Sequence, residues 1–524
     1  MNRIQILDCT LRDGGYINDF EFGRLGIKKI IAQLTRSNID IIECGFLEDG
    51  NDDPDLSLYS TVDQIAEHLP QDHGCSMYVA MACYGEYDIS QLKPYDGKSI
   101  DGIRVTFHYN EVDEAIEYCR QIKDKGYKVF VQPVGTTSYS DEQLMALIHQ
   151  VNGLQPYSFY LVDTLGLMHK QDVMRFFYLI DHNLDKNIHI GFHSHNNLQL
   201  SYSNCQALVG VVTSRVISLD ASVYGMGRGA GNLNTELIAN YINDHISRRY
   251  NIEPLLEVID EYILNIKAEH DWGYSVPYYL AAINGCHPNY ASYLSGKQTL
   301  TIQSIGAILR MIEPEKRSLF DKKIAEEKYL EYQSNEIDDT QAIAQLKDQV
   351  KGRKVMLIAP GPSLNDNVEK ILDVVKREEC LVISATFVPN FLETDFVFLS
   401  NLKRYNTTFN TDKRKVNLIC TSNISIDEPN LYVVNYSSLL NEEDAIRDNT
   451  SVMLINLLKR LEVSTIFVAG MDGYRANQDN YYLESLKFVQ DVEHYKILND
   501  AMTAKMKSLR QNMDIRFVTP SLYD

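Results

Sequence analysis

Paired cysteines are absent from this chain of 524 residues, whose nine cysteines are scattered, odd in number and without a C-x-x-C pair. Such a set indicates reduced thiols rather than a disulfide framework, and it offers no structural zinc site of the C-x-x-C type. The sequence also lacks an uninterrupted apolar stretch long enough to span a bilayer, and no basic start precedes an apolar signal core. We therefore expect a soluble, cytoplasmic protein.

Basic residues are outnumbered by acidic ones. Lysine and arginine together number 50 and aspartate and glutamate number 71, which gives a formal net charge of −21. A chain this acidic repels phosphate backbones, so general nucleic-acid binding is not expected. The length exceeds what one hydrophobic core usually supports, and two or more domains are predicted.

Short β-rich runs alternate with longer amphipathic stretches up to about residue 245. The predicted strands are residues 4–9, 40–44, 76–82, 102–108, 128–134, 159–163, 189–195 and 216–224. The stretches with apolar residues at helical spacing include 111–125, 141–151, 171–181 and 198–209. Eight strand and helix units predict an α/β fold of the (β/α)8 TIM-barrel type, and a doubly wound open sheet fits this count less well.

Polar residues gather at the carboxyl ends of these predicted strands. In a TIM barrel the loops at that end form the active-site face, so the barrel would bring these side chains to one mouth. The residues are Asp13, Glu43, His108, Gln132, Asp163, Thr164, His193 and His195.

Three of these residues have the chemistry of metal ligands. His193 and His195 are two residues apart in a predicted strand and therefore face the same side. Together with the carboxylate of Asp13 they form a set that leaves coordination positions open for water or substrate, as catalysis requires. A single H-x-H alone is more often an ordinary strand with two polar residues. The predicted convergence at one barrel mouth favours the metal site.

The second half of the chain changes in character. Residues 246–348 are predicted to be a helical extension and linker, with a helix at 255–267 and a charged stretch at 313–349. From 349 to 524 we predict a second, smaller Rossmann-like α/β domain. Its expected strands are residues 355–359, 381–385, 396–399, 416–420, 431–434 and 465–469. The first domain would accordingly cover residues 1–245.

Five motifs occur in one order over about the first 240 residues. They are Asp8-Cys9-Thr10-Leu11-Arg12-Asp13-Gly14-Gly15, Ile42-Glu43-Cys44-Gly45, Asp163-Thr164-Leu165-Gly166, Gly191-Phe192-His193-Ser194-His195-Asn196-Asn197 and Gly225-Met226-Gly227-Arg228-Gly229-Ala230-Gly231-Asn232. On these motifs the N-terminal half resembles the DRE-TIM metallolyase superfamily, also called the HMG-CoA lyase-like family. Within it the sequence is most similar to the 4-hydroxy-2-oxovalerate aldolases.

The resemblance implies a divalent-metal-dependent aldolase that makes or cleaves a carbon–carbon bond next to a 2-oxo acid, with pyruvate as the expected donor and an aldehyde as its partner. It implies that Asp13, His193 and His195 bind the metal, manganese or magnesium first and zinc or cobalt as alternatives. Arg12 would steady the 2-oxo acid and its enolate. Asn232 would complete the coordination shell, or the glycines around it serve only a tight loop.

One position departs from the family pattern. The aldolases usually have a histidine three residues after the metal-binding aspartate as the base for the substrate hydroxyl, and this chain has Tyr16. Tyrosine is a poor base at neutral pH unless a nearby positive charge lowers its pKa. Tyr16, His108, Tyr274 and His287 are the candidates for proton transfer, the last two on segments that could fold back over the barrel mouth. Glu43 is expected to hold Arg12 or another neighbour instead of reacting itself.

Two related reactions leave different sequence signatures. HMG-CoA lyase needs a cysteine in its glycine-rich loop, and residues 225–232 contain none. The acyl-CoA condensing synthases carry Gly-Glu-Arg-Ala-Gly-Asn there, whereas this chain has Gly-Arg-Gly-Ala-Gly-Asn. The loop is therefore closer to that of the aldolases, and acyl-CoA condensation stays an alternative.

The second domain resembles bacterial sialyltransferase-like domains through residues 359–364 and 468–474. The amides of Gly361 and Ser363, with Asp472 nearby, would bind a nucleotide or nucleotide sugar, or the serine is simply a helix N-cap. The fusion suggests a role in sugar-acid or surface-polysaccharide biosynthesis. The alternative is a catalytically silent barrel scaffold beside a sugar-nucleotide-binding or transferase domain. We also expect a homo-oligomer.

Overall fold

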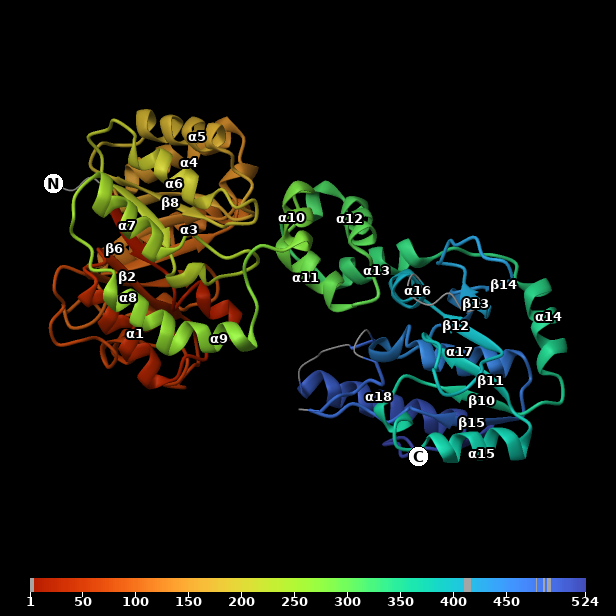
Figure 1. Ribbon diagram of the computed structural model, residues 1–524. Coiled ribbons are helices and arrows are strands. Elements are labelled where there is room, and N and C mark those ends of the chain that lie inside the picture. Colours follow the sequence, from red (N-terminus) through yellow and green to blue (C-terminus); the bar gives the residue numbers. More distant parts are fainter. Residues whose placement is uncertain (1–3, 410–415, 477, 484–485, 488–491) are drawn as a thin grey trace. The chain divides into compact units, whose positions relative to one another are not determined.

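The computed structural model (Figure 1) describes residues 4–409, 416–476, 478–483, 486–487 and 492–524. The chain forms two compact units. Unit 1 comprises Met1–Ser292 and Ile312–Asp321, and unit 2 comprises Tyr293–Met311 and Lys322–Asp524. The segment 246–348, expected to be an extension of its own, is thus divided between the two units.

Unit 1 is a closed parallel barrel. Its eight strands are β1 (Ile4–Asp8), β2 (Ile41–Leu47), β4 (Met77–Cys83), β5 (Gly102–Phe107), β6 (Lys128–Pro133), β7 (Ser158–Asp163), β8 (His189–Ser194) and β9 (Ile217–Ala221). They pair in the order β1-β9-β8-β7-β6-β5-β4-β2, and β1 also pairs with β2 to close the ring. A two-residue strand, β3 (Leu58–Tyr59), lies beside β2. The predicted TIM barrel is therefore confirmed.

Amphipathic helices surround the barrel. They are α1 (Arg24–Arg36), α2 (Val62–Ala66), α3 (Val112–Asp124), α4 (Asp141–Leu154), α5 (Lys170–Asn183), α6 (Ser201–Val209) and α7 (Thr235–His245). Next come α8 (Glu253–Val258), a π-helical turn (Ile259–Ile263), α9 (Leu264–Glu269), α10 (Val276–Ile283) and the start of α11 (Pro288–Gly296). The apolar faces of α1 to α9 pack on the outside of the strands in one continuous hydrophobic layer.

The two faces of each strand have different partners. In β5, Ile103, Val105 and Phe107 belong to the hydrophobic layer shared with the helices. Arg104 lies between them and faces the opposite side, where it contacts β2 and β9 from within the barrel. This alternation, which follows from the period of two in a strand, fills the barrel interior with the charged side chains of the site.

Unit 2 is a doubly wound parallel sheet. Its strands are β10 (Val355–Ile358), β11 (Leu381–Ala385), β12 (Phe396–Leu399), β13 (Asn417–Thr421), β14 (Leu431–Val434), β15 (Thr465–Ala469) and β16 (Asp514–Phe517). Across the sheet they lie in the order β14-β13-β12-β11-β10-β15-β16. The chain adds strands first on one side of β10 and then on the other, so the strand order reverses between β10 and β15. The Rossmann-like prediction is correct, and only β16 is added to the predicted strands.

Helices cover both faces of this sheet. The helices of unit 2 are α12 (Ile302–Met311), α13 (Lys322–Gln333), α14 (Thr340–Val350), α15 (Val368–Glu378), α16 (Leu402–Phe409), α17 (Thr450–Arg460) and α18 (Val492–Leu509). One core joins α14, α17 and α18 to the sheet, and a second joins α15 to it. No helix in the described ranges of the two units is long and apolar enough to cross a membrane.

We predict that Gly470, at the junction that follows β10 and β15, cannot be replaced by a residue with a side chain. Gly470 has φ +75°, and a Cβ there would lie 2.1 Å from the carbonyl oxygen of Ala359. Gly352 has a similar φ of +69°, but a Cβ added to it would meet no atom within 4 Å, so it is the matched control. We expect Gly470→Ala to destabilise the protein by about 1–3 kcal/mol more than Gly352→Ala, because only the first adds a steric clash to the cost of a positive φ.

This difference is measured by urea denaturation of the full chain followed by circular dichroism. Equal losses in the two variants would contradict the packing at this junction.

Candidate metal centre

Three predicted ligands meet at the carboxyl end of the barrel. Asp13 lies in the turn after β1, His193 lies near the end of β8, and His195 follows that strand directly. One ligand atom from each residue lies within 4.8 Å of those of the other two, and all three side chains are buried. The alternation along β8 places both imidazoles on the same side, as the sequence predicts.

The Asp13 carboxylate is fixed from two sides. Arg12 Nη1 donates to its Oδ1 at 2.8 Å, and Asn232 Nδ2 donates to its Oδ2. Burial alone would raise the pKa of Asp13, but the positive charge of Arg12, with contributions from the two histidines, holds that pKa well below its usual range. The carboxylate is therefore ionised, which is the form that a metal ligand needs.

The two histidines are prepared for coordination in different ways. His193 Nδ1 lies 3.0 Å from Asp220 Oδ2, an arrangement that fixes the ring and leaves Nε2 for a metal. Burial lowers the pKa of His195 to about 3, helped by the charges of His193 and Arg228. A neutral imidazole is the coordinating form.

A buried chain of charges links Arg12 to the metal ligand His193. Arg12 Nε donates to Glu43 Oε2 at 2.8 Å, and the same oxygen lies 2.7 Å from Arg104 Nη1. Arg104 also donates to Asp220 Oδ2, the oxygen that faces His193. The side chain of Arg104 is 0% exposed. The expectation that Glu43 holds Arg12 agrees with these contacts.

Two neutral side chains complete the surroundings of Arg104. Its guanidinium lies over the ring of Tyr160, 4.9 Å from the ring centroid. In the amide orientation that satisfies both groups, the Gln132 oxygen accepts from Arg104 Nε at 3.0 Å. The interior is thus built to hold one arginine between two carboxylates.

Asn232 lies beside the three candidate ligands and bonds to one of them, Asp13. It forms a backbone bridge with His195, and its side-chain Oδ1 is buried without a hydrogen-bond partner among the described residues. A Cβ at Gly227 would lie 2.3 Å from Asn232 Nδ2 and 2.9 Å from Asp13 Oδ2, so only glycine leaves room here. An orphaned oxygen beside one carboxylate and two imidazoles fits a divalent cation.

Asp163 and Thr164 have roles in the backbone. The carboxylate of Asp163 accepts from the amides of Leu167 and Met168, at 2.9 and 3.0 Å. The Thr164 hydroxyl accepts from the amide of Gly135 at 2.9 Å. Both residues therefore shape the loops at the mouth.

Tyr16 packs between Phe20 and Phe46, and the guanidinium carbon of Arg228 lies 3.6 Å from its ring centroid. Burial raises the pKa of Tyr16 to about 12, although Arg228 and Arg12 act in the opposite direction. The lowered pKa that a base would need is not found. At neutral pH the hydroxyl is therefore protonated.

The other proton-transfer candidates are placed less favourably. The backbone amide of His108 donates to Glu111 Oε2 at 2.7 Å at the start of a helical turn. Tyr274 is 60% exposed. Burial lowers the pKa of His287 to about 4, and its Nδ1 accepts from the amide of Asn289 at 3.2 Å. Within the described residues, no hydrogen bond or ion pair joins these three side chains to the metal ligands.

The segment after α9 does lie against the glycine-rich loop at the mouth. The amide of Gly273 donates to the carbonyl oxygen of Gly229 at 3.3 Å, and Trp272 Nε1 donates to that of Tyr224 at 3.4 Å. Pro288 lies so close to Gly229 that an added Cβ there would be 3.3 Å from it. These contacts hold the loop from outside.

The predicted phosphate site in unit 2 is arranged differently from expectation. The amide of Gly361 donates to the carbonyl oxygen of Gly470 at 2.7 Å, and the amide of Ser363 donates to Asp472 Oδ2 at 2.7 Å. The helical turn that follows, η8 (Pro362–Leu364), has only three residues. Because both amides are already bonded within the protein, they have no free hydrogen for a phosphate.

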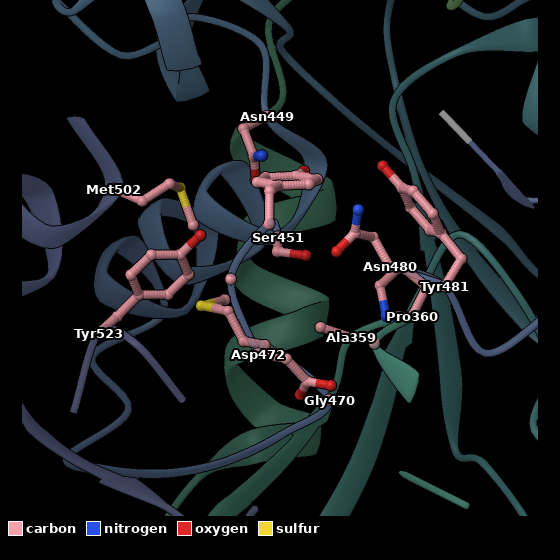
Figure 2. Close-up of a pocket in the computed structure, with 14 residues that line it drawn as sticks. Ala359, Pro360, Asn449, Ser451, Gly470, Asp472, Asn480, Tyr481, Met502 and Tyr523 are labelled. Carbon is pink, nitrogen blue, oxygen red and sulfur yellow. The ribbon is translucent and has the colours of Figure 1, made fainter. Parts of the chain in front are cut away.

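A pocket lies next to these residues (Figure 2). In Figure 2, Tyr523 and Met502 lie on one side, and Asn480 and Tyr481 lie on the other. Its base consists of residues that follow β10 and β15. A pocket at the point where the strand order reverses is the usual position of a ligand in such sheets.

Arg104, Asp220 and Arg228 are site residues that the sequence patterns did not single out. Arg104 and Asp220 are charged residues inside otherwise apolar strands, and this was the available signal. Arg228 is the only long charged side chain in the loop 225–232.

Comparison with known proteins places the similarity on the barrel. Residues 102–261 match the HMGL-like family model. The 4-hydroxy-2-oxovalerate aldolase of Roseiflexus castenholzii is 26% identical over 266 residues, which are 49% of this chain and 75% of the relative. The oxaloacetate decarboxylase of Mycobacterium tuberculosis is 24% identical over 245 residues, or 44% and 68% of the two chains. The crystal structure of HMG-CoA lyase from Bacillus subtilis is 17% identical with a TM-score of 0.40 and covers 51% of this chain and 92% of its own.

Asp220, the second carboxylate in the buried chain of charges from Arg12 to His193, gives a prediction about metal binding. Asp220→Asn should weaken Mn²⁺ binding by about 10- to 100-fold, because the residue that orients the His193 ring is lost. Binding is measured from the electron paramagnetic resonance signal of free Mn²⁺. Asp8→Asn is the matched control, since Asp8 is also buried but is bonded to Thr10 and Thr235. Unchanged affinity in Asp220→Asn, or an equal loss in Asp8→Asn, would contradict this role.

Proposed function

The barrel unit belongs to the DRE-TIM metallolyase superfamily, the HMGL-like lyases, and on that premise we propose that it is a divalent-metal-dependent aldolase acting next to a 2-oxo acid, with pyruvate as the enolised partner. Manganese or magnesium is the proposed metal. The observation that supports the proposal best is the buried set Asp13, His193 and His195 with Arg12 directly beside it.

The protein would hold the metal through Asp13, His193 and His195, with Asn232 Oδ1 as a further ligand. When bound, a divalent cation acts as a Lewis acid that offsets the charge of an enolate. The Asp13 carboxylate and the His193 ring are held by their hydrogen bonds, so little reorganisation is needed at the moment of reaction.

Arg12 would bind the 2-oxo acid. Its Nε is bonded to Glu43 and its Nη1 to Asp13, while Nη2 has no hydrogen bond to the described residues. That nitrogen can donate to the carboxylate or enolate oxygen of the substrate. Because Glu43 and Asp13 fix the guanidinium plane, the donor is oriented before substrate binds.

Tyr16 would donate a hydrogen bond to a substrate oxygen. Its pKa of about 12 keeps the hydroxyl protonated at neutral pH, so we propose a donor role instead of a base. The contact of its ring with Arg228, and the charges of Arg12 and Asp13 that act on its pKa, support this proposal.

Two other interpretations are less well supported. A silent scaffold requires neither the three ligands nor the buried chain from Arg12 to Asp220, and both are present. Acyl-CoA condensation would release a free thiol from acetyl-CoA in the presence of a 2-oxo acid, which a thiol reagent detects. We propose the aldol reaction ahead of both.

Pyruvate enolisation is tested by deuterium exchange into its methyl group, followed by NMR with added Mn²⁺ or Mg²⁺. We expect metal-dependent exchange in the wild type and a rate about 10²- to 10³-fold lower in Arg12→Gln, since one oriented donor is lost. Arg249→Gln is the matched control, because Arg249 binds the carbonyl oxygen of Ile4 at the opposite end of the barrel. The proposal fails if the wild type shows no exchange above the buffer rate.

For unit 2 we propose that a nucleotide or nucleotide sugar binds in the pocket of Figure 2, instead of at the amides of Gly361 and Ser363. The supporting observation is its place beside β10 and β15, where the strand order reverses. Tyrosine, asparagine and serine side chains line it, and these can stack on a ring and bond to its edges. An aldol product that is a sugar acid or a surface-polysaccharide precursor would connect the two units.

This binding is tested by calorimetric titration of the full chain with nucleoside diphosphates and nucleotide sugars. Ser451→Phe should weaken binding at least about tenfold, because it fills the pocket with a bulky ring. Ser464→Phe is the matched control, since Ser464 is exposed and precedes β15 at the other end of the sheet. Absence of binding to every compound, or equal effects of the two variants, would contradict the proposal.

A further inference from the structure

Arg228 differs from the other arginines of the barrel mouth. Arg12 pairs with Asp13 and Glu43, and Arg104 pairs with Glu43 and Asp220. In the described part of the chain, no carboxylate lies within ion-pair distance of Arg228. A partly buried guanidinium without an acidic partner is costly unless another anion completes it.

The backbone of the loop that carries Arg228 is fixed on several sides. The amide of Gly231 donates to the carbonyl oxygen of Arg228 at 3.0 Å, and the amide of Ala230 donates to Asn197 Oδ1 at 2.9 Å. Gly229 and Gly231 have φ of +65° and +78°, a conformation that favours glycine. The position of Arg228 is therefore set by the fold before any ligand binds.

The side chain of Arg228 is held by stacking instead of by charge. Its guanidinium carbon lies 3.6 Å from the centroid of the Tyr16 ring, which Phe20 and Phe46 support from its edges. Stacking uses the face of a guanidinium and leaves the N–H groups in its plane able to donate. Tyr16 thus serves as a platform that orients a cation.

The charge of Arg228 also acts on the metal site. It lowers the pKa of Asp13 and of His195, and it contributes to the lowered pKa of His287. The geometry of the loop also places Arg228 near the ligands, since a Cβ on the preceding residue, Gly227, would lie 2.9 Å from Asp13 Oδ2. A substrate bound to the metal can therefore extend to Arg228. With Arg12 assigned to the 2-oxo acid, Arg228 is free for the distal end of the substrate.

Building on the proposed aldolase function, we propose that Arg228, stacked on Tyr16, is an anion-binding subsite and that the aldehyde partner carries a carboxylate or phosphate. The shared chemistry is an anionic group at the end of the substrate away from the forming bond. The in-plane N–H groups of Arg228 would bind it in a bidentate manner.

The proposal is tested with matched aldehyde pairs in pyruvate addition by the full chain with Mn²⁺. The pairs are succinic semialdehyde with butanal, and glyceraldehyde 3-phosphate with glyceraldehyde. We expect the wild type to prefer one anionic member by about 10- to 100-fold in kcat/KM, since hydrogen bonds to charged groups are the strong ones. The pair that shows the preference identifies the anion.

Variants of Arg228 distinguish a loss of anion binding from a general loss of activity. Arg228→Gln should bring the ratio of kcat/KM within the preferred pair close to one, and Arg228→Lys should keep part of it. Arg248→Gln removes the same charge from an exposed position and should leave the ratio unchanged. The inference is overturned if the wild type shows no preference in either pair, or if Arg228→Gln and Arg248→Gln change the ratio equally.

A binding measurement gives a readout independent of catalysis. The metal-free protein is titrated with succinate and with glycerol 3-phosphate, and Arg228→Gln should weaken one of these at least about tenfold. Suppose that the wild type exchanges deuterium into pyruvate, but that Arg228→Gln changes neither the kcat/KM ratio within the aldehyde pair nor the binding of succinate and glycerol 3-phosphate. This result would overturn the inference and leave the aldolase function intact. Absent exchange would refute the function, and the titration alone would then decide the subsite. If Arg228→Gln abolishes pyruvate exchange, Arg228 binds pyruvate itself and the inference is also overturned.

Discussion

The active-site end of the barrel depends on one arginine that has no contact with solvent. Arg104 lies between the carboxylates of Glu43 and Asp220, and through them it positions both Arg12 and His193. Removing one partner of such a buried pair typically costs about 3–5 kcal/mol, because the remaining charge is left uncompensated. Arg12 and His193 are consequently not independent elements. A change at the centre of the barrel would displace both together.

This arrangement follows from the geometry of a closed parallel sheet. Every second side chain faces inward, so a charged residue on one strand meets residues from strands far away in the sequence. Arg104 and Asp220 are 116 positions apart. The helix layer outside is apolar and continuous, and it excludes water from the interior. In that dry interior each ion pair is stronger, and each unpaired charge is costlier, than at the surface.

Much of the fold and part of the site could be predicted from the sequence. The eight strands were visible because apolar runs and turns alternate regularly, and the spacing of His193 and His195 indicated a shared face. The role of Arg104 was hidden, since a charged residue in an apolar strand does not reveal which distant acid it meets. The division of 246–348 between two units was hidden as well, because an amphipathic helix does not specify the core against which it packs.

In the glycine-rich loop, residues 225–232, different positions serve the metal centre and the proposed anion subsite. Gly227 leaves room for the metal ligands, and the backbone around residue 228 is held by glycines and by Asn197. The side chain at 228 can therefore be exchanged during evolution without rebuilding the metal centre. Under the proposed function, homologous barrels could diversify their preference among aldehydes through this one position, while the enolate chemistry stays the same. The barrel mouth would then be a stable platform for the emergence of new metabolic activities.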